Sequence, residues 1–438
     1  MRVLLVSTYD LGHQPFGLAS PAAWLRARGH QVECVDASLA PVSGEAFQDA
    51  GLIAFFLPMH TATRLAVPLI ERARRVNPSA RVCCFGLYAA LNREHLRTLG
   101  VEACFGAEFE TALVEFAEGR VAKETAHLAR QRFLTPDRST LPSLRLYPQL
   151  VTDSGATVAG YTEASRGCKH LCRHCPVVPV YRGAFRVVSA DVVLADIRQQ
   201  VEAGARHITF GDPDFLNGPA HARRIVERLH HEFPEVTYDA TIKIEHLLKH
   251  RSILPVLRGT GCLFVTSAVE SLDDAVLARL DKGHTRADFF AAAELMRESG
   301  LALAPTFIPF TPWTTAASYR DLLASLHELE LVEHTAPLQL ALRLLIPAHS
   351  LLLELSDVAA CIDRFDPPAL LYRWNHPDPS MDWLSASAMQ TVQDAQREQA
   401  SRREIFERLW TLAHGKAMGD DPRPARATIP YLEEPWYC

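Results

Sequence analysis

Short apolar runs alternate with helix-length segments along the first 118 residues. Each run has the length and composition of a buried strand, and segments 22–30 and 64–76 have the apolar period of a helix. The runs lie at residues 2–7, 31–37, 52–58, 81–86 and 101–106. Strands separated by helices predict parallel βαβ units, so we expect a doubly wound, Rossmann-like α/β domain over residues 1–118. Ligands of such sheets bind beyond the carboxyl ends of the strands.

A second series of strand-like runs begins near Tyr161. The runs lie at residues 207–212, 237–244, 262–270, 302–310 and 338–347. Helical segments such as 193–205 and 286–300 separate them, which predicts a partial β/α barrel over residues 161–350. The segment 119–160 is rich in proline and lacks a clear period, so we predict a linker there. Residues 351–438 predict a mostly helical region that ends in a polar, proline-rich tail.

Composition restricts the class of protein. With 48% hydrophobic and 22% charged residues among 438, the chain has the usage of an ordinary globular protein. Its net charge of −6 carries no signal for nucleic-acid binding. No apolar run reaches the roughly 18 residues that a membrane helix needs, and the start MRVLLVSTYD is typical of a first strand rather than a signal peptide. We therefore expect a cytoplasmic protein that contacts neither nucleic acid nor a membrane.

The most unusual feature of the composition is the presence of ten cysteines. In a large chain without an export signal, metal ligation or thiol chemistry explains them better than a disulfide framework does. Cys168, Cys172 and Cys175 have CxxxCxxC spacing directly after the expected first barrel strand. Three thiolates on one tight loop can bind three corners of a 4Fe-4S cluster and leave the fourth iron open. A structural zinc site that uses His170 or His174 is the alternative, although no second CxxC is present.

On this motif and its barrel context, the sequence resembles the radical S-adenosylmethionine (radical SAM) superfamily. In that family the open iron holds the amino and carboxylate groups of SAM, and one electron from the cluster cleaves a C–S bond to give a carbon radical. The segments 210–218, 241–247 and 267–285 resemble the family's SAM-binding layout. The resemblance implies SAM contacts from Asp212, Asp214, Lys243, Glu245, Glu270 and Ser271. Turn, capping or salt-bridge roles for these residues stay open, as do packing or surface roles for Lys282 and His284.

The expected Rossmann-like domain ahead of the barrel resembles the cobalamin-dependent group of that superfamily. Members of the group often hold cobalamin between the two domains, and some carry DxHxxG after the first strand, with the histidine on cobalt. This chain has Asp10-Leu-Gly-His13-Gln-Pro-Phe-Gly17 there, with a spacing that departs by one residue on each side. The resemblance makes His13 a candidate catalytic residue, as a cobalt ligand or a substrate contact. It also leaves open a domain that binds no corrin and only shapes the substrate pocket.

The chain ends in Cys438, directly after the apolar and aromatic segment IPYLEEPWY. Such a segment predicts a tail that docks, and we expect it at the barrel mouth. The ending resembles the radical SAM group with CUAEP/CCAEP tails, although this chain stops at the first cysteine of such a tail. Cys438 is therefore a second candidate catalytic residue, as a thiol that holds a soft atom or reduces an intermediate. We expect the other six cysteines to be ordinary buried residues: Cys34, Cys83, Cys84, Cys104, Cys262 and Cys361.

Three functions stay open from the sequence. The first is a radical SAM enzyme that binds cobalamin and transfers a methyl group to an unactivated carbon or phosphorus. The second works without cobalamin and transfers the 3-amino-3-carboxypropyl group of SAM to a thiophilic acceptor such as trivalent arsenic, as in arsinothricin biosynthesis. The third is a non-catalytic iron–sulfur or zinc protein. Either enzyme would act on a small molecule and take electrons from a donor such as flavodoxin or ferredoxin. Further substrate contacts suggested by position are His60, Tyr88, Trp313 and Arg343.

Overall fold

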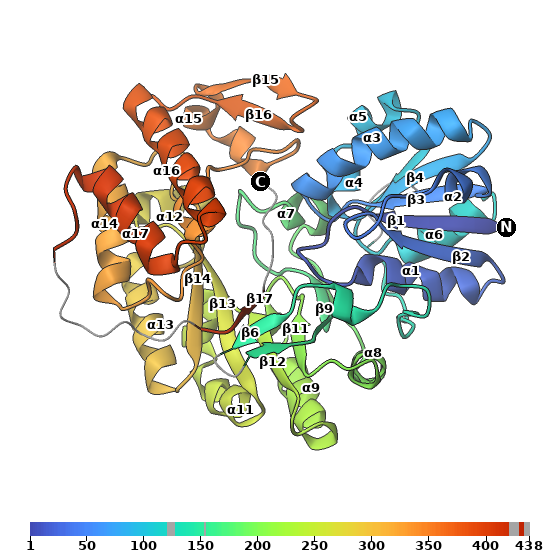
Figure 1. Cartoon of the computed structure of the whole chain (residues 1–438), viewed down its shortest axis with the longest axis horizontal. Helices are drawn as coiled ribbons and strands as arrows, with labels where there is room; N and C mark the ends of the chain where they lie inside the picture. The colour runs from blue at the N-terminus through green and yellow to red at the C-terminus, as the bar shows by residue number, and fades with distance from the viewer. Residues whose placement is uncertain (121–127, 153–154, 420–428, 433–438) are drawn as a thin grey trace.

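The computed structural model describes residues 1–120, 128–152, 155–419 and 429–432. Figure 1 shows two lobes side by side, an N-terminal lobe in blue and a larger lobe in green to red that contains the barrel strands. The fold is α/β, as the sequence predicts. A parallel five-stranded sheet comes first, a partial barrel follows it, and helices dominate the C-terminal region.

The N-terminal lobe is built on a parallel sheet of order β2-β1-β3-β4-β5. Its strands are β1 Arg2–Ser7, β2 Gln31–Asp36, β3 Leu52–Phe56, β4 Arg81–Phe85 and β5 Ala103–Phe105. One face is covered by α1 Phe16–Arg26 and α6 Glu110–Ala117. The other is covered by α2 Gly44–Gln48, α3 His60–Val76, α4 Leu87–Leu91 and α5 Arg93–Thr98. The strand order changes direction between β1 and β3, so the switch point of the sheet lies at their carboxyl ends.

Two local features of this lobe follow from simple packing. Cys83 and Cys84 are adjacent on β4 and pack in the two different cores, because successive side chains of a strand point to opposite faces. Helix α1 begins at Phe16 rather than at residue 22, where the sequence analysis placed its start. It contains Pro21, which removes one backbone hydrogen bond, but all residues from Phe16 to Ala22 are buried, and this burial maintains the helix.

The barrel lobe holds five parallel strands in the order β14-β13-β12-β11-β8. They are β8 Ala159–Thr162, β11 His207–Phe210, β12 Thr237–Thr241, β13 Cys262–Glu270 and β14 Ala302–Phe307. The main core lies between these strands and the helices outside them, which are α8 Ala190–Glu202, α9 Pro219–Glu232, α10 Ile244–Lys249, α11 Leu254–Gly259, α13 Arg286–Glu298 and α14 Ala316–Glu328. Helix α12 Asp274–Leu280 packs in a smaller cluster with Leu344 and Ile346. The strand register pairs Thr241 with Thr266 and Ala268 with Thr306 on the inner face. These small residues are half-buried, so the inside of the barrel is less tightly filled than the core.

The barrel ends at β14, because the run 338–347 is not a strand. It forms a short 3-10 helix, η4 Pro337–Leu340, and a single bridge between Phe310 and Arg343. The backbone N–H of Phe307 donates to the side-chain oxygen of Gln339 at 3.1 Å, so a side chain takes the place of a sixth strand. An apolar run of this length does not by itself distinguish a strand from other buried structure, and this explains the wrong prediction.

The linker and the C-terminal region meet at the far end of the barrel. The linker contains β6 Leu150–Thr152 and β7 Gly155–Thr157. The C-terminal region contains α15 Ser356–Ala359, α16 Pro379–Arg397, α17 Arg402–His414 and an unforeseen antiparallel pair, β15 Ile362–Asp366 and β16 Leu371–Trp374. Strand β17 Tyr431–Leu432 pairs with β6, and Ile429 packs against Ala159 at the start of β8. The described part of the tail therefore docks opposite the expected barrel mouth, and Cys438 lies outside the described residues.

A buried guanidinium group joins the two lobes. Arg166 lies on β9 Ser165–Gly167, which pairs with β10 Phe185–Val187. Its Nη1 atom is 2.6 Å from Glu110 Oε1 and 3.4 Å from Glu108 Oε2, and both glutamates belong to the N-terminal lobe. Its Nε atom donates to Glu163 at 2.7 Å. Three carboxylates thus share one cation at a place where water screens little, so each depends on the arginine.

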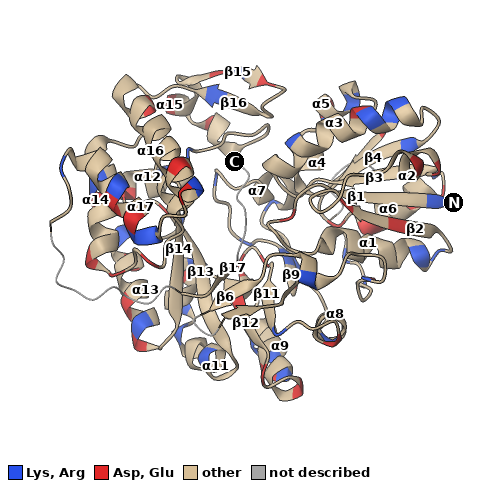
Figure 2. Cartoon of the chain, in the orientation of Figure 1, with Lys and Arg blue, Asp and Glu red and all other residues tan. Residues whose placement is uncertain are grey.

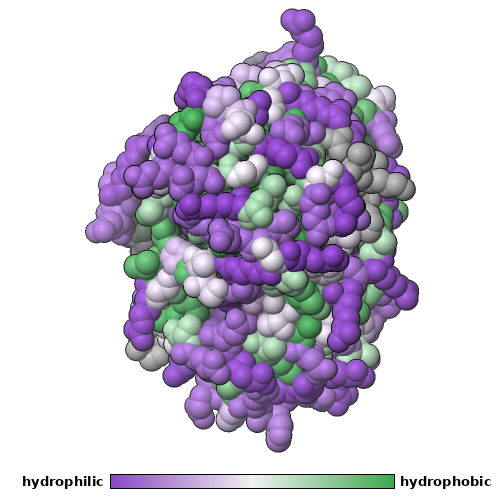
Figure 3. Space-filling view, turned by 90° about the vertical axis from the view of Figure 1, so that its right-hand side faces the viewer, coloured by the Kyte–Doolittle hydropathy of each residue, from purple (hydrophilic) through white to green (hydrophobic). Residues whose placement is uncertain are grey.

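The parts of the outer surface drawn in Figures 2 and 3 mix residues of different kinds. Figure 2 shows residues of both charges mixed over the helices. Figure 3 shows the outer face of the N-terminal lobe, where hydrophobic residues form small, separate areas among hydrophilic ones. Such scattered areas are normal for a protein surface. Within the described part of the chain, no helix has both the length and the apolar character to cross a membrane.

We predict that Arg166→Met lowers the free energy of unfolding by about 3–5 kcal/mol, because it leaves buried carboxylates without their cation. Urea unfolding under anaerobic conditions measures this. Arg223→Met is the matched control, since Arg223 forms an exposed ion pair with Glu227 and its loss should cost about 1 kcal/mol or less. Equal losses in the two variants would contradict the role given to Arg166.

Candidate functional site

The CxxxCxxC loop connects β9 to α7 Val177–Tyr181 and gathers three thiols. Gly167 is required before it, because φ is +74° there and an added Cβ would lie 2.4 Å from the carbonyl oxygen of Ala184. Cys168 and Cys172 are buried and Cys175 is half-buried. Burial raises the pKa of Cys175 to about 12, and the sulfurs of Cys172 and Cys168 add to the shift. Thiols with such a raised pKa are expected to become thiolates when a metal binds.

Residues after β11 support this loop. The side-chain oxygen of Asn217 accepts a hydrogen bond from the backbone N–H of Lys169 at 3.3 Å and lies 4.0 Å from Cys168 Sγ. Asp214 Oδ2 lies 2.6 Å from His246 Nδ1 and 3.4 Å from His170 Nε2. Burial alone would raise the pKa of Asp214, but the hydrogen bonds of the two histidines lower it to about 2. Asp214 is therefore an ionised anchor for His170 of the cysteine loop.

Asp212 has a different environment from Asp214. It is buried and accepts hydrogen bonds from the backbone N–H of Ala164 at 2.9 Å and from the hydroxyl of Ser165. Burial raises its pKa to about 7, although these hydrogen bonds oppose the shift. Its visible contacts hold the turn between β8 and β9. Ser271 likewise accepts the backbone N–H of Asp273 at 3.1 Å in a local turn.

A network of lysines and glutamates lies beside the cysteines. Lys243 Nζ is 3.8 Å from Cys172 Sγ and 3.7 Å from Glu245 Oε2. Glu270 Oε1 is 3.1 Å from Lys282 Nζ and 3.1 Å from His174 Nε2. Burial would raise the pKa of Glu270, but Lys282 and His174 hold it well below its usual range. Glu245 and His170 also meet at 3.6 Å, so the network connects the ends of β12 and β13 to the cysteine loop.

The backbone at Glu270 is strained in a way that aims this side chain. Its φ is +69°, an unusual value for a residue with a Cβ, and it follows a register shift between β13 and β14. Such irregularities turn a side chain away from the ordinary strand direction. Here the redirected carboxylate bonds to His174, which lies between Cys172 and Cys175 in the sequence.

Several buried polar atoms at this place lack a partner within the described residues. Both ring nitrogens of His284, Nδ1 of His174 and Nδ2 of Asn217 have none. Burial lowers the pKa of His284 to about 4, and the charges of Lys282 and Lys243 add to the shift, so the ring is neutral. An unsatisfied buried polar group costs about 1–3 kcal/mol. These atoms are thus suited to bind a polar ligand beside the cysteines.

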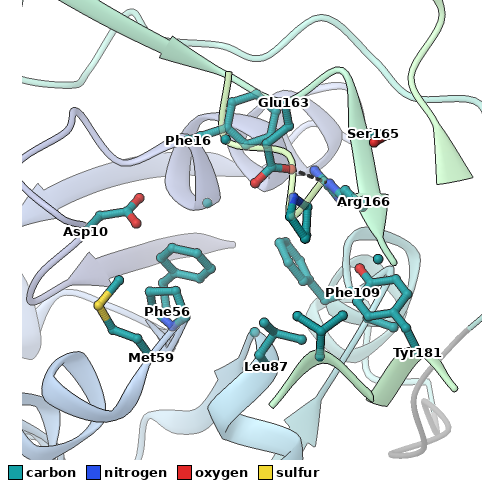
Figure 4. Close-up of a pocket in the computed structure, with 18 of the residues that line it drawn as sticks. Asp10, Phe16, Phe56, Met59, Leu87, Phe109, Glu163, Ser165, Arg166 and Tyr181 are labelled. Carbon is teal, nitrogen blue, oxygen red and sulfur yellow. Dashed lines mark hydrogen bonds and ion pairs between the residues drawn. The ribbon is translucent and has the colours of Figure 1, made fainter. Parts of the chain in front are cut away.

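A cavity of about 190 Å³ lies at the junction of the two lobes. It is lined by residues that follow β1, β3, β4 and β5, and by Gly167 and Val177 on either side of the cysteine loop. Figure 4 shows the carboxylates of Asp10 and Glu163 pointing into it, with the rings of Phe16, Phe56 and Phe109 around it. The cavity therefore occupies the switch point of the sheet and touches the cysteine loop.

Other candidates from the sequence lie elsewhere. His13 does not line this cavity; its ring packs on Tyr161 with centroids 4.7 Å apart, and burial lowers its pKa to about 4. The hydrogen-bond partners of His60, Trp313 and Arg343 are the Ala369 carbonyl, Asp357 and the Trp374 carbonyl, respectively. Burial raises the pKa of the Tyr88 hydroxyl, and the nearby thiol of Cys175 raises it further. Cys361 is half-buried, whereas the sequence analysis expected it to be buried.

Comparison with known proteins identifies the barrel. A model of the radical SAM superfamily matches residues 162–322, which include the cysteine loop and the lysine–glutamate network. These residues form a radical SAM domain. The ribosomal protein uS12 methylthiotransferase RimO of Geobacter sulfurreducens is 25% identical over 263 residues, which are 53% of this chain and 56% of that protein.

Solved structures resemble the chain beyond the radical SAM domain. The radical SAM methyltransferase TsrM of Kitasatospora setae, solved with tryptophan and a SAM analogue, has a TM-score of 0.66 at 16% identity. The alignment covers 89% of this chain and 88% of TsrM. The cobalamin-dependent radical SAM enzyme OxsB, solved with aqua-cobalamin, has a TM-score of 0.67 at 13% identity, over 90% of this chain and 67% of OxsB. At these identities the likeness establishes the shared two-lobed fold.

The residues around the cysteines fit a cluster and SAM. Three thiols on one loop are the donor set of an iron–sulfur cluster with one open iron. One smaller donor set, Cys168, His170 and Asp214, has ligand atoms within 4.8 Å of one another and would suit a single metal ion, but it leaves out Cys172 and Cys175. The unpaired atoms of His284 and Asn217 would be available to hydrogen-bond polar groups of SAM. The described residues of the radical SAM domain are thus compatible with both cofactors.

Cobalamin, in contrast, does not fit at the switch point of the sheet. The ring of Phe56, the last residue of β3, packs against α1, where a Cβ added to Gly17 would lie 2.1 Å from it. The cavity of about 190 Å³ beside it is smaller than the roughly 300–1,000 Å³ of sites for drug-sized ligands, and cobalamin is larger than these ligands. A separate cavity of about 620 Å³ adjoins α4 and α7. The residues at the switch point itself therefore favour a lobe that binds no corrin there.

Several site residues were not identified from the sequence. Glu163 and Arg166 stand just before the cysteine motif, and Asn217 stands in the segment 210–218. Their proximity to a recognised motif is the one signal in the sequence that could have marked them as site residues. The sequence suggests His170 only as a zinc ligand. Its ion pairs depend on Asp214 and Glu245, whose positions relative to the loop follow only from the folded barrel.

We predict that anaerobic reconstitution of the wild-type chain gives about four irons per chain, whereas Cys172→Ala retains markedly less. Iron and zinc analysis after gel filtration measures this. Cys361→Ala serves as the control, because Cys361 lies outside the loop and its thiol donates to the carbonyl of Val358. One zinc per chain in place of iron would contradict the cluster assignment.

The raised pKa of Asp212 predicts a pH dependence of stability. Because the folded-state pKa of about 7 lies above the usual 3.8, protonation at Asp212 favours the fold at low pH, and this contribution is lost as the pH rises towards 7. In Asp212→Asn it is missing, so the stability advantage of the wild type over the variant should shrink by about 2–3 kcal/mol from pH 5 to pH 8. Urea unfolding at both pH values checks this. With exposed Asp191→Asn the difference should stay constant, and a constant difference for Asp212→Asn would refute the prediction.

Proposed function

We propose that the protein is a radical SAM transferase that works without a corrin. It would cleave SAM reductively at a cluster on Cys168, Cys172 and Cys175 and pass a SAM-derived group to a small molecule in the interdomain cavity. One observation carries the proposal: the unpaired polar atoms around His284 and the cavity lined by Gly167 and Val177 both adjoin the cysteine loop. Cofactor and substrate sites that share one loop can bring the reacting groups together.

The residues of the chain have separate roles in this proposal. When bound, the cluster supplies the electron that cleaves a C–S bond of SAM. Lys243 and Lys282 place positive charge beside the thiolates, and Glu270 holds Lys282 and His174 in position. The neutral ring of His284 offers one donor and one acceptor to SAM. The packed junction of the lobes keeps water from the reacting groups.

The transferred group and the electron donor are part of the proposal. The 3-amino-3-carboxypropyl group is the SAM-derived group that we assign to a corrin-free site, with methylthioadenosine as the product left from SAM. A small flavodoxin or ferredoxin would deliver the electron. A second candidate is cobalamin-dependent methyl transfer, which the likeness to TsrM and OxsB over most of the chain favours. It would require Phe56 to leave the switch point.

We expect the reconstituted wild-type chain to form methylthioadenosine from SAM when dithionite is added, because this product remains when the 3-amino-3-carboxypropyl group is transferred. Formation of 5′-deoxyadenosine alone would indicate adenosyl-radical chemistry without group transfer and would contradict the proposed transferase. Anaerobic incubation followed by liquid chromatography measures both. Cys172→Ala should form about 100-fold less product or lower, because the electron comes from the cluster, while Cys361→Ala should match the wild type. Equal product from Cys172→Ala would refute the proposed function.

A further inference from the structure

The cavity of about 620 Å³ beside α4 and α7 is lined by basic and apolar side chains. Figure 1 shows these two helices next to each other at the junction of the lobes. Arg93 belongs to the N-terminal lobe, Arg182 follows α7, and His349 precedes the 3-10 helix η5 Leu351–Glu354. The other described residues that line the cavity are apolar, and no carboxylate is among them. Two guanidinium groups and an imidazole from three parts of the chain therefore meet at one recess.

These basic groups have no internal partner. Within the described part of the chain, the side chains of Arg93, Arg182 and His349 form no hydrogen bond or ion pair. Other exposed arginines, such as Arg223, pair with a carboxylate of a neighbouring residue. Arg182 and His349 are exposed and Arg93 is half-buried, so all three can be reached from outside. They are thus available to acidic groups of another molecule.

The same recess reaches the cysteine loop. Leu171, directly before Cys172, lines it and is 50% exposed. An exposed apolar residue surrounded by polar and charged groups is the usual arrangement of a protein–protein interface. Arg93, Leu171, Arg182 and His349 together are called the basic face below. A protein bound over this face would lie beside a ligand of the expected cluster.

We propose that the basic face docks a small acidic electron-carrier protein, such as an acidic flavodoxin. The inference rests on the proposed function and assigns the docking site of its electron donor. In the step that it serves, the reduced flavin loses one electron and the cluster gains one, and no bond forms or breaks between the two proteins.

The charge and the openness of the recess favour this partner. The chain has a net charge of −6 and repels an acidic protein over most approaches. Contacts at the basic face would instead attract it and fix its orientation. A small anion fits less well, because sites for small molecules bury most of the ligand, whereas Leu171, Arg182 and His349 are exposed.

Calorimetric titration of the reconstituted full-length protein with an acidic flavodoxin tests the docking site. Arg93→Glu and Arg182→Glu should each weaken binding by about tenfold, because each reverses a charge that faces the acidic partner. Arg206→Glu is the matched control and should leave the affinity unchanged. Arg206 is exposed and precedes β11, which is parallel to β8, so it lies at the end of the barrel opposite the cysteine loop. Absence of binding to the wild type, or unchanged affinity in both variants at the basic face, would overturn the inference.

Turnover with two reductants separates this inference from the proposed function. With dithionite, Arg182→Glu should form methylthioadenosine at the wild-type rate, because a small reductant needs no docking surface. With limiting flavodoxin, kept reduced by NADPH and a flavodoxin reductase, the variant should be about tenfold slower. Equal rates with flavodoxin, or an equal loss with both reductants, would overturn the inference. Failure of the wild type with dithionite would refute the proposed function, and the calorimetric result would then decide the docking site by itself.

Discussion

The structure depends on one guanidinium that two lobes share. Arg166 is bonded to Glu108 and Glu110 from the end of β5 and to Glu163 from the barrel, and it stands two residues before Cys168. The start of the cysteine loop is therefore fixed to the carboxyl edge of the N-terminal sheet. The same ion pairs form one wall of the interdomain cavity and determine its charge. A buried group of this kind is stable only while all its members are present, so the two lobes and the radical SAM site form one unit.

In this protein, similarity of the fold does not imply similarity of the ligand site. The chain shares its two-lobed architecture with TsrM and OxsB over about nine-tenths of its length. The switch point of the N-terminal sheet, where ligands of such sheets bind, is nevertheless occupied by Phe56 against Gly17 and Gly86. One aromatic side chain thus changes what the crevice can hold. Function follows from such local chemistry rather than from the fold alone.

The sequence predicted the features that depend on local periodicity. Strands such as 2–7 and 262–270 follow from uninterrupted apolar or alternating runs, and the cysteine loop follows from spacing alone. The false strand at 338–347 shows the limit, because the contact that replaces it comes from Gln339 to a strand more than thirty residues away. The partners of Arg166 lie 56 and 58 residues before it, so no motif could reveal them. The direction of Glu270 depends on a backbone irregularity that its sequence does not specify.

The central claim is that the junction of the lobes is a small-molecule site and not a corrin site. The most direct measurement is metal analysis of the full chain after anaerobic reconstitution with iron, sulfide and excess hydroxocobalamin, followed by gel filtration. The account predicts about four irons per chain and no retained cobalt. Retention of about one cobalt per chain, with corrin absorption bands at about 350–550 nm, would contradict it.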